Sequence, residues 1–136
     1  IHTKYDLLRA VLEGVVYSLR ECLDILRGMG VVSSEITACG GGGKSPLWRQ
    51  MLADVFGCPV GTVSSSEGPA LGAAILAGVG AGLFKSVEEG CRAAVRTSPE
   101  RQLPDPESSV RYEPYYRLYR QLYPALRESF AALAAL

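Results

Sequence analysis

Four consecutive glycines, Gly40–Gly43, constrain this chain more than any other feature of its sequence. The β-prone residues 36–39 lead into them, and a helical pattern that begins at Pro46 follows. Ser45 suits the N-cap of that helix, and Pro46 suits its first turn, where a missing N–H does no harm. The stretch therefore predicts a strand, a tight turn and a helix N-terminus in direct succession.

Such a turn has the local geometry of a phosphate-binding site. Glycines lack Cβ atoms, so a ligand can approach the backbone closely and several amide N–H groups can point at one anion. The positive end of the following helix would lie beside them, and Lys44 would add a charge unless it is simply solvated. The candidate binding residues are Gly40, Gly41, Gly42, Gly43, Lys44 and Ser45.

Two widespread phosphate-binding motifs do not fit this turn. The P-loop pattern requires a glycine where the chain has Ala38. The dinucleotide fingerprint G-x-G-x-x-G requires its third glycine at Ser45 or at Pro46, depending on which glycine starts it. The sequence therefore predicts a different class of nucleotide or phosphate turn.

The composition of the 136-residue chain is that of one globular domain, with 48% hydrophobic residues. Fourteen basic and fourteen acidic residues cancel without forming blocks, which argues against nucleic acid or an anionic membrane as a partner. No apolar run approaches the roughly 20 residues of a membrane span. The four widely spaced cysteines are interpreted as reduced core residues of a cytoplasmic protein, not as disulfides or metal ligands.

The first half of the chain predicts a parallel βαβ unit behind a long helix. A capping box at Thr3 and apolar residues three and four apart predict a helix over residues 4–27. The helix Pro46–Phe56 separates the first strand from a second one at Val60–Val63, and this length suits a right-handed crossover. Within that helix, Trp48, Met51, Leu52 and Val55 form the buried stripe, with Arg49, Gln50 and Asp54 largely off it.

The second half predicts helices and a polar connection. A helix over residues 69–78 is rich in small residues and is expected to pack on the sheet, unless its Gly72 leaves room for a flat ligand. A short helix should follow Ser86. Residues 97–111, with several prolines and charges, predict an exposed linker before a last helix from Pro114, which Pro124 should kink or split.

Spaced motifs in this order resemble the C-terminal region of the FGGY carbohydrate kinases, and most closely the xylulose kinases. Residues 40–60 begin Gly-Gly-Gly-Gly-Lys-Ser-Pro-Leu-Trp-Arg-Gln-Met, and residues 67–74 read Glu-Gly-Pro-Ala-Leu-Gly-Ala-Ala. Residues 7–15, 112–114 and 122–124 extend the likeness over nearly the whole chain. Two positions depart from the pattern: Gly43 stands where alanine is common, and Pro69 where a small residue is expected.

The resemblance implies an α/β fold that is half of an actin-like ATPase, related to ribonuclease H, with a short sheet packed by several helices. It implies that ATP or ADP binds along Gly40, Gly41 and Gly42, with Ser45 near the adenosine. It further implies a sugar acceptor, D-xylulose by likeness to the xylulose kinases, and, again by likeness only, a homodimer. The family places the catalytic aspartate and the Mg²⁺ ligands upstream, so no residue here is assigned as catalytic or metal-binding, and residues 1–136 alone are expected to be inactive.

Three functional hypotheses remain open from the sequence. The favoured one is the ATP-binding part of a cytoplasmic sugar kinase, because the glycine turn and its helix are intact. The start at Ile1, directly before a helix cap, leads us to expect a piece of a longer protein. The second is a nucleotide-binding or regulatory module that kept the half-fold without chemistry. The third is a structural α/β domain whose glycines merely turn a corner.

Overall fold

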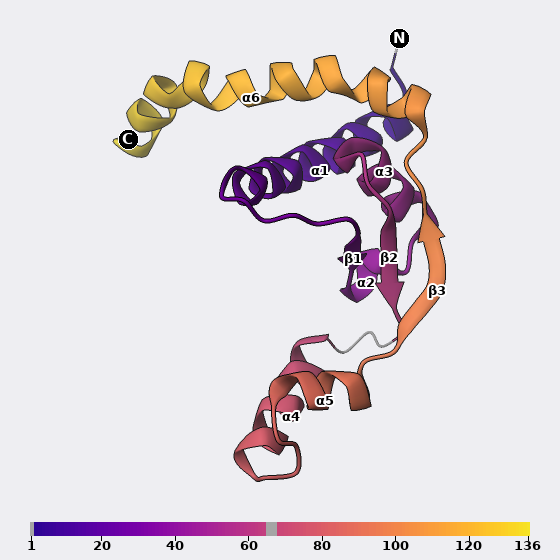
Figure 1. Cartoon of the computed structure of the whole chain (residues 1–136). Helices are drawn as coiled ribbons and strands as arrows, with labels where there is room; N and C mark the ends of the chain where they lie inside the picture. The colour runs from indigo at the N-terminus through magenta and orange to yellow at the C-terminus, as the bar shows by residue number, and fades with distance from the viewer. Residues whose placement is uncertain (1, 65–67) are drawn as a thin grey trace.

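A computed structural model describes residues 2–64 and 68–136 of the chain. A three-stranded sheet lies at its centre, between two groups of helices at its opposite ends (Figure 1). The elements in chain order are α1 Lys4–Gly28, β1 Ile36–Ala38, α2 Gly40–Gly43, α3 Pro46–Phe56, β2 Val60–Val63, α4 Gly68–Gly80, α5 Val87–Ala94, β3 Thr97–Gln102 and α6 Pro106–Ala134.

The predicted parallel βαβ unit is present. β1 pairs with β2 in parallel, with Ile36 opposite Val60, and α3 forms the crossover between them. Gly57, in the left-handed conformation at φ 67°, ends α3. At the other end, the hydroxyl of Ser45 accepts a hydrogen bond from the Trp48 N–H, so the predicted N-cap is confirmed.

The prediction that residues 97–111 form a linker was wrong. Thr97–Gln102 forms the third strand, β3, which pairs antiparallel with β2 and places Gln102 opposite Val60. Its polar side chains point largely to solvent, but Arg101 forms an ion pair with Glu35, which precedes β1. Pairing with β2 supplies the backbone hydrogen bonds that these residues would not favour by themselves.

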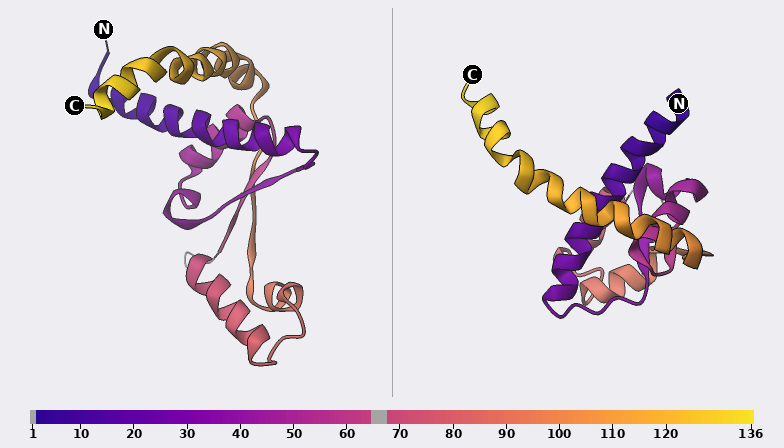
Figure 2. Two further views of the ribbon diagram at one scale, coloured as in Figure 1. Left: turned by 90° about the vertical axis from the view of Figure 1, so that its left-hand side faces the viewer. Right: turned by 90° about the horizontal axis from the view of Figure 1, so that it is seen from above.

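The last helix also begins earlier than predicted. Asp105 caps it by accepting a hydrogen bond from the Ser108 N–H, and Pro106 occupies its first turn. Pro114 therefore lies inside α6, as does Pro124, and neither splits the helix. Figure 2 shows α6 curving along its length and diverging from α1 toward its C-terminal end.

The hydrophobic core lies where α1, α3 and α6 meet above the sheet. Val16, Val55 and Val60 are the largest of its fully buried side chains. The ring of Tyr17 packs against Tyr112, Tyr116 and Tyr119 of α6, with ring centroids 5.5–6.2 Å apart. Tyr112 and Tyr116 are buried in this packing, and their hydroxyls donate to Glu13 and Asp24 of α1.

An alkaline pH should weaken this core. Burial raises the pKa of Tyr17 to about 12, and the Glu13 carboxylate adds to the rise. Because the unfolded value is near 10, Tyr17 stabilises the fold fully below about pH 10 and loses that contribution as the pH rises toward about 12. We expect the free energy of unfolding to fall there by up to about 1.4 kcal/mol per pH unit for this group.

Urea unfolding at a series of alkaline pH values measures this loss. Tyr17→Phe should reduce the dependence without abolishing it, because burial also raises the pKa of Tyr112 and Tyr116. A slope identical to that of the wild-type chain would contradict the assignment to Tyr17.

The helices α4 and α5 form a separate layer at the far end of the sheet (Figure 1). The prediction that the small-residue helix packs on the sheet was wrong, because α4 packs on α5. Ile75 is buried beside Gly90, and the ring of Phe84 lies against both Gly78 and Gly90. The small residues of α4 therefore permit close helix-to-helix contact.

The four cysteines are free thiols, as predicted. Only Cys58 is buried, whereas Cys22 and Cys39 are exposed, so the interpretation of all four as core residues was wrong. Among residues 2–64 and 68–136, no helix combines the length and the apolar character that a bilayer crossing requires.

Candidate functional site

The predicted tight turn is present, and its four glycines form one helical turn, α2. Gly40 takes φ 72°, a conformation that glycine adopts without strain, and this lets the chain bend sharply after β1. The N–H groups of Lys44 and Ser45 then donate to the carbonyls of Gly41 and Gly42. α2 therefore leads directly into the N-terminus of α3.

The glycines of α2 do not share one environment. Gly41 and Gly42 are exposed, and a Cβ atom added at Gly41 would meet nothing within 4 Å. A Cβ at Gly42 would lie 3.2 Å from Trp48 Nε1, and one at Gly43 would lie 2.5 Å from the Ala38 carbonyl oxygen. Gly43 thus packs inward against the end of β1, while Gly41 and Gly42 present their backbone to solvent.

The first turn of α2 lacks a capping side chain. Cys39 occupies the N-cap position, but its side chain accepts no hydrogen bond from the helix. The first N–H groups of a helix have no partner inside the helix, so an external acceptor can use them. Lys44 is exposed beside this turn and makes no ion pair within the described part of the chain. Ser45 has its hydroxyl engaged in capping α3.

Arg49 is a residue of this site that the sequence reasoning placed wrongly. It is only 3% exposed, and its Nη1 donates to the Gly43 carbonyl oxygen at 2.7 Å. Its Nε donates to Gln102 at 2.7 Å, and its Nη2 pairs with Glu100 at 3.1 Å. Arg49 therefore fastens the end of the glycine turn to β3. No local signal predicts this, because both acceptors on β3 are about 50 residues further along the chain.

Asp54, also predicted to lie largely off the buried stripe, is 7% exposed. Its Oδ1 accepts hydrogen bonds from the Gln50 side chain and from the Asp105 N–H, each at 2.8 Å. Asp54 thereby joins the C-terminal half of α3 to the start of α6. Arg49 and Asp54 thus attach the two ends of α3 to β3 and to the start of α6. Both of these segments fall within residues 97–111, which the sequence predicted to be an exposed linker.

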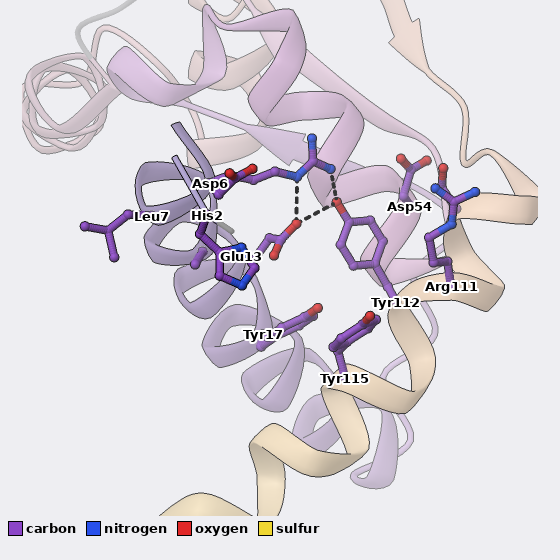
Figure 3. Close-up of a pocket in the computed structure, with 12 residues that line it drawn as sticks. His2, Asp6, Leu7, Glu13, Tyr17, Asp54, Arg111, Tyr112 and Tyr115 are labelled. Atoms are coloured by element: carbon purple, nitrogen blue, oxygen red, sulfur yellow. Dashed lines mark hydrogen bonds and ion pairs between the residues drawn. The ribbon is translucent and has the colours of Figure 1, made fainter. Parts of the chain in front are cut away.

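A cavity of about 670 Å³ lies elsewhere, between α1 and the first turns of α6 (Figure 3). Arg9 donates to Glu13 and to the Tyr112 hydroxyl, both at 2.8 Å, and that hydroxyl donates to Glu13 at 3.3 Å. Burial raises the pKa of Tyr112 and the hydrogen bond from Arg9 opposes the rise. Arg9, Glu13 and Tyr112 therefore satisfy one another on the wall of this cavity.

Metal-binding clusters are missing from the part of the chain that the structure describes: no three His, Cys, Asp or Glu side chains come together there. The candidate site is therefore the exposed backbone of α2 with Lys44 and the capped N-terminus of α3. It offers hydrogen-bond donors and positive charge, which suit an anion.

Comparison with known proteins decides the family. The model of the C-terminal domain of the FGGY family of carbohydrate kinases matches residues 2–81, a stretch that includes α1, the glycine turn, α3 and β2. The chain belongs to the FGGY family of carbohydrate kinases. The resemblance stated from the spaced motifs is thus confirmed.

FGGY relatives match beyond the residues of the family model. The xylulose kinase of Staphylococcus epidermidis is 39% identical over 132 residues, which cover 97% of this chain and 26% of that protein. The solved, ligand-bound xylulose kinase from Lactobacillus acidophilus has a TM-score of 0.82 at 27% identity and likewise covers 97% of this chain and 26% of its own. This chain therefore spans about a quarter of the length of the relatives it matches.

A second solved neighbour carries a different name. The gluconate kinase from Lactobacillus acidophilus has a TM-score of 0.79 at 26% identity, with 97% of this chain and 26% of that chain covered. The predicted α/β fold, a part of the actin-like fold of sugar kinases, is confirmed by these neighbours. The same fold thus occurs in kinases that are named for different acceptors.

Proposed function

We propose that this chain is the ATP-binding portion of a carbohydrate kinase that transfers the γ-phosphate of ATP to a sugar hydroxyl, with D-xylulose as the acceptor. The observation that carries the proposal is that the family match includes the strand, glycine turn and helix of residues 36–56, where Gly41 and Gly42 expose their backbone. Membership in a family of carbohydrate kinases supports the reaction class, and the exposed backbone of the turn supports this stretch as the nucleotide site.

The residues of the turn fit a nucleotide phosphate. The uncapped N–H groups at the start of α2 can donate to phosphate oxygens, and a ligand can approach Gly41 without meeting a side chain. Lys44 can contribute a positive charge from the rim. Gly43 supports the turn from behind, because its inner side is filled by Ala38 and Thr62.

ATP supplies the phosphoryl group, and Mg²⁺ screens its charge. Phosphoryl transfer is promoted mainly by positioning and by charge stabilisation around the γ-phosphate. We assign the catalytic base and the Mg²⁺ ligands to the rest of a longer kinase polypeptide, so residues 1–136 alone should bind nucleotide without phosphorylating sugar. The assignment of D-xylulose follows the xylulose kinase relatives and is tested by assaying the longer polypeptide with a panel that includes gluconate.

Gly41→Val is expected to lower the affinity for ADP at least about tenfold, because two methyl groups would occupy the space through which a phosphate reaches the backbone. The fold should remain intact, since no protein atom lies within 4 Å of the added Cβ. Calorimetric titration with ADP measures the affinity, and circular dichroism checks the fold. Gly42→Val is a poorer probe, because it would also displace Trp48.

Gly80→Val is the matched control for this titration. Gly80 ends α4, and its Cβ would also meet nothing within 4 Å. Unchanged ADP binding by Gly41→Val would contradict the proposed nucleotide site. ADP binding without ATP-dependent phosphorylation of any sugar by the longer polypeptide would instead favour the non-catalytic module.

A further inference from the structure

The row of side chains by which α6 packs against α1 continues along α6 past the end of that contact. Tyr112, Tyr116 and Tyr119 pack against Tyr17 of α1 and are spaced four and three residues apart. The same alternation of four and three continues along α6 through further apolar residues, which we call the distal stripe. The distal stripe consists of Tyr123, Leu126, Phe130 and Leu133.

The distal stripe lies beyond the part of α6 that packs against α1. The two helices diverge along α6 (Figure 2), and every residue from 121 to 136 is exposed. The four side chains of the stripe are 43–68% exposed, although Tyr123 and Phe130 already stack with centroids 6.1 Å apart. A contiguous apolar row of this length on a helix marks an interaction surface.

The α1–α6 interface shows what a partner of this stripe should look like. Arg120 flanks the packed stripe and lies 3.8 Å from Glu21 of α1. Arg127 stands one heptad later on the same flank, yet it has no acidic partner within the described part of the chain. The missing surface should therefore be apolar with an acidic side chain beside it, as α1 is.

A second copy of α6 does not meet this requirement. In an antiparallel pair, the flank that carries Arg120 and Arg127 would face the same flank of the other copy, so like charges would meet. In a parallel pair, these arginines would face Leu122 and Ser129 of the other copy, which offer no negative charge.

The remainder of a kinase polypeptide is the better occupant. This chain corresponds to 26% of its xylulose kinase relative from Staphylococcus epidermidis and to 26% of the solved chain from Lactobacillus acidophilus. Most of such a polypeptide is therefore available to cover α6. Contact within one polypeptide also avoids the entropy of association that a separate partner loses on binding.

We propose that the distal stripe of α6 docks, in the same polypeptide, on a part of the kinase outside residues 1–136 that presents an apolar face with a carboxylate opposite Arg127. The inference rests on the proposed function only in requiring a longer kinase polypeptide. It gives α6 two roles: its first half joins α1 and α3, and its second half holds the substrate-binding remainder.

Hydrogen exchange of the longer kinase polypeptide, followed by mass spectrometry over residues 121–136, tests the docking. Docked amides should exchange at least about 100-fold more slowly than those of residues 1–136 alone. Phe130→Asp should lower this protection at least about tenfold, and Arg127→Glu should lower it more than Arg127→Lys. Ala132→Asp, which puts the same charge on the opposite face of α6, should change it less than about twofold.

Three outcomes would overturn the proposal. The first is equal protection in Phe130→Asp and Ala132→Asp, and the second is no protection in the wild-type polypeptide. The third is protection that grows with protein concentration, together with a dimer mass in sedimentation that Phe130→Asp abolishes. This third result would identify a second copy as the occupant. ADP titration of the same samples keeps the tests separate, because loss of nucleotide binding with intact protection would refute only the proposed function.

Discussion

Replacing Gly43 by alanine is expected to destabilise this chain by about 3 kcal/mol, even though alanine is the better helix former and is common at this position of the FGGY pattern. The new Cβ would lie 2.5 Å from the Ala38 carbonyl oxygen and 3.1 Å from the Thr62 hydroxyl. That carbonyl is backbone, held in place by a hydrogen bond from Thr62 at 2.9 Å, so it cannot simply rotate away. Either β1 or α2 must shift, and both support the candidate nucleotide turn.

Gly41→Ala is the matched control for this substitution. It adds the same methyl group to the same helical turn, but the methyl meets nothing within 4 Å, so the change in unfolding free energy should stay within about 0.5 kcal/mol. Urea denaturation of both variants gives the comparison. A Gly43→Ala variant within about 1 kcal/mol of the wild-type chain would show that the turn does not need a glycine there.

Tyr116→Ala should be the most destabilising single change in the core, at about 4 kcal/mol. Tyr116 is 2% exposed, and its ring packs against Tyr17 and under the guanidinium of Arg20, whose Cζ lies 4.0 Å from the ring centroid. Its hydroxyl donates to Asp24 Oδ2 at 2.7 Å. The substitution leaves a cavity and removes a hydrogen bond to a charged acceptor.

Two further variants divide this effect into its parts. Tyr116→Phe keeps the ring and should lose about 1.5–3 kcal/mol from the hydrogen bond to Asp24. Tyr115→Ala removes a neighbouring tyrosine that is 62% exposed and should cost less than about 1 kcal/mol. Thermal and urea unfolding measure all three, and equal losses at positions 115 and 116 would contradict the packing described for α6.

The parts of the fold that could be predicted are those that local chemistry determines. Ser45, Pro46 and Gly57 mark both ends of α3, and a helix of that length between two short apolar runs indicates a parallel pair of strands. Likewise, Thr3 and Asp6 form the predicted capping box at the start of α1. The position of the candidate turn follows from the glycines themselves, because few other structures accommodate four of them after a strand.

The parts that could not be predicted depend on partners far away in the sequence. β3 contains Pro99, Glu100 and Arg101, which do not favour a strand, and it forms because β2 offers a free edge. In the sequence, Arg49 and Asp54 look like surface residues of an amphipathic helix. Their burial is favourable because Arg49 pairs with the Glu100 carboxylate and Asp54 accepts a hydrogen bond from the Asp105 backbone N–H. The start of α6 was misplaced because Pro114 resembled a first-turn proline, whereas Pro106 holds that position.

The segment that contains α4 and α5 leaves the sheet and returns to it at the same place. The Ser64 N–H and hydroxyl both donate to the Arg96 carbonyl oxygen, at 2.9 and 2.7 Å, where β2 ends and β3 is about to begin. Topologically, β2 and β3 are thus a hairpin whose loop has become a small helical module. Because closing a loop of twice the length costs only about 0.6 kcal/mol more, this module can lengthen, shrink or be exchanged while the hairpin keeps its register.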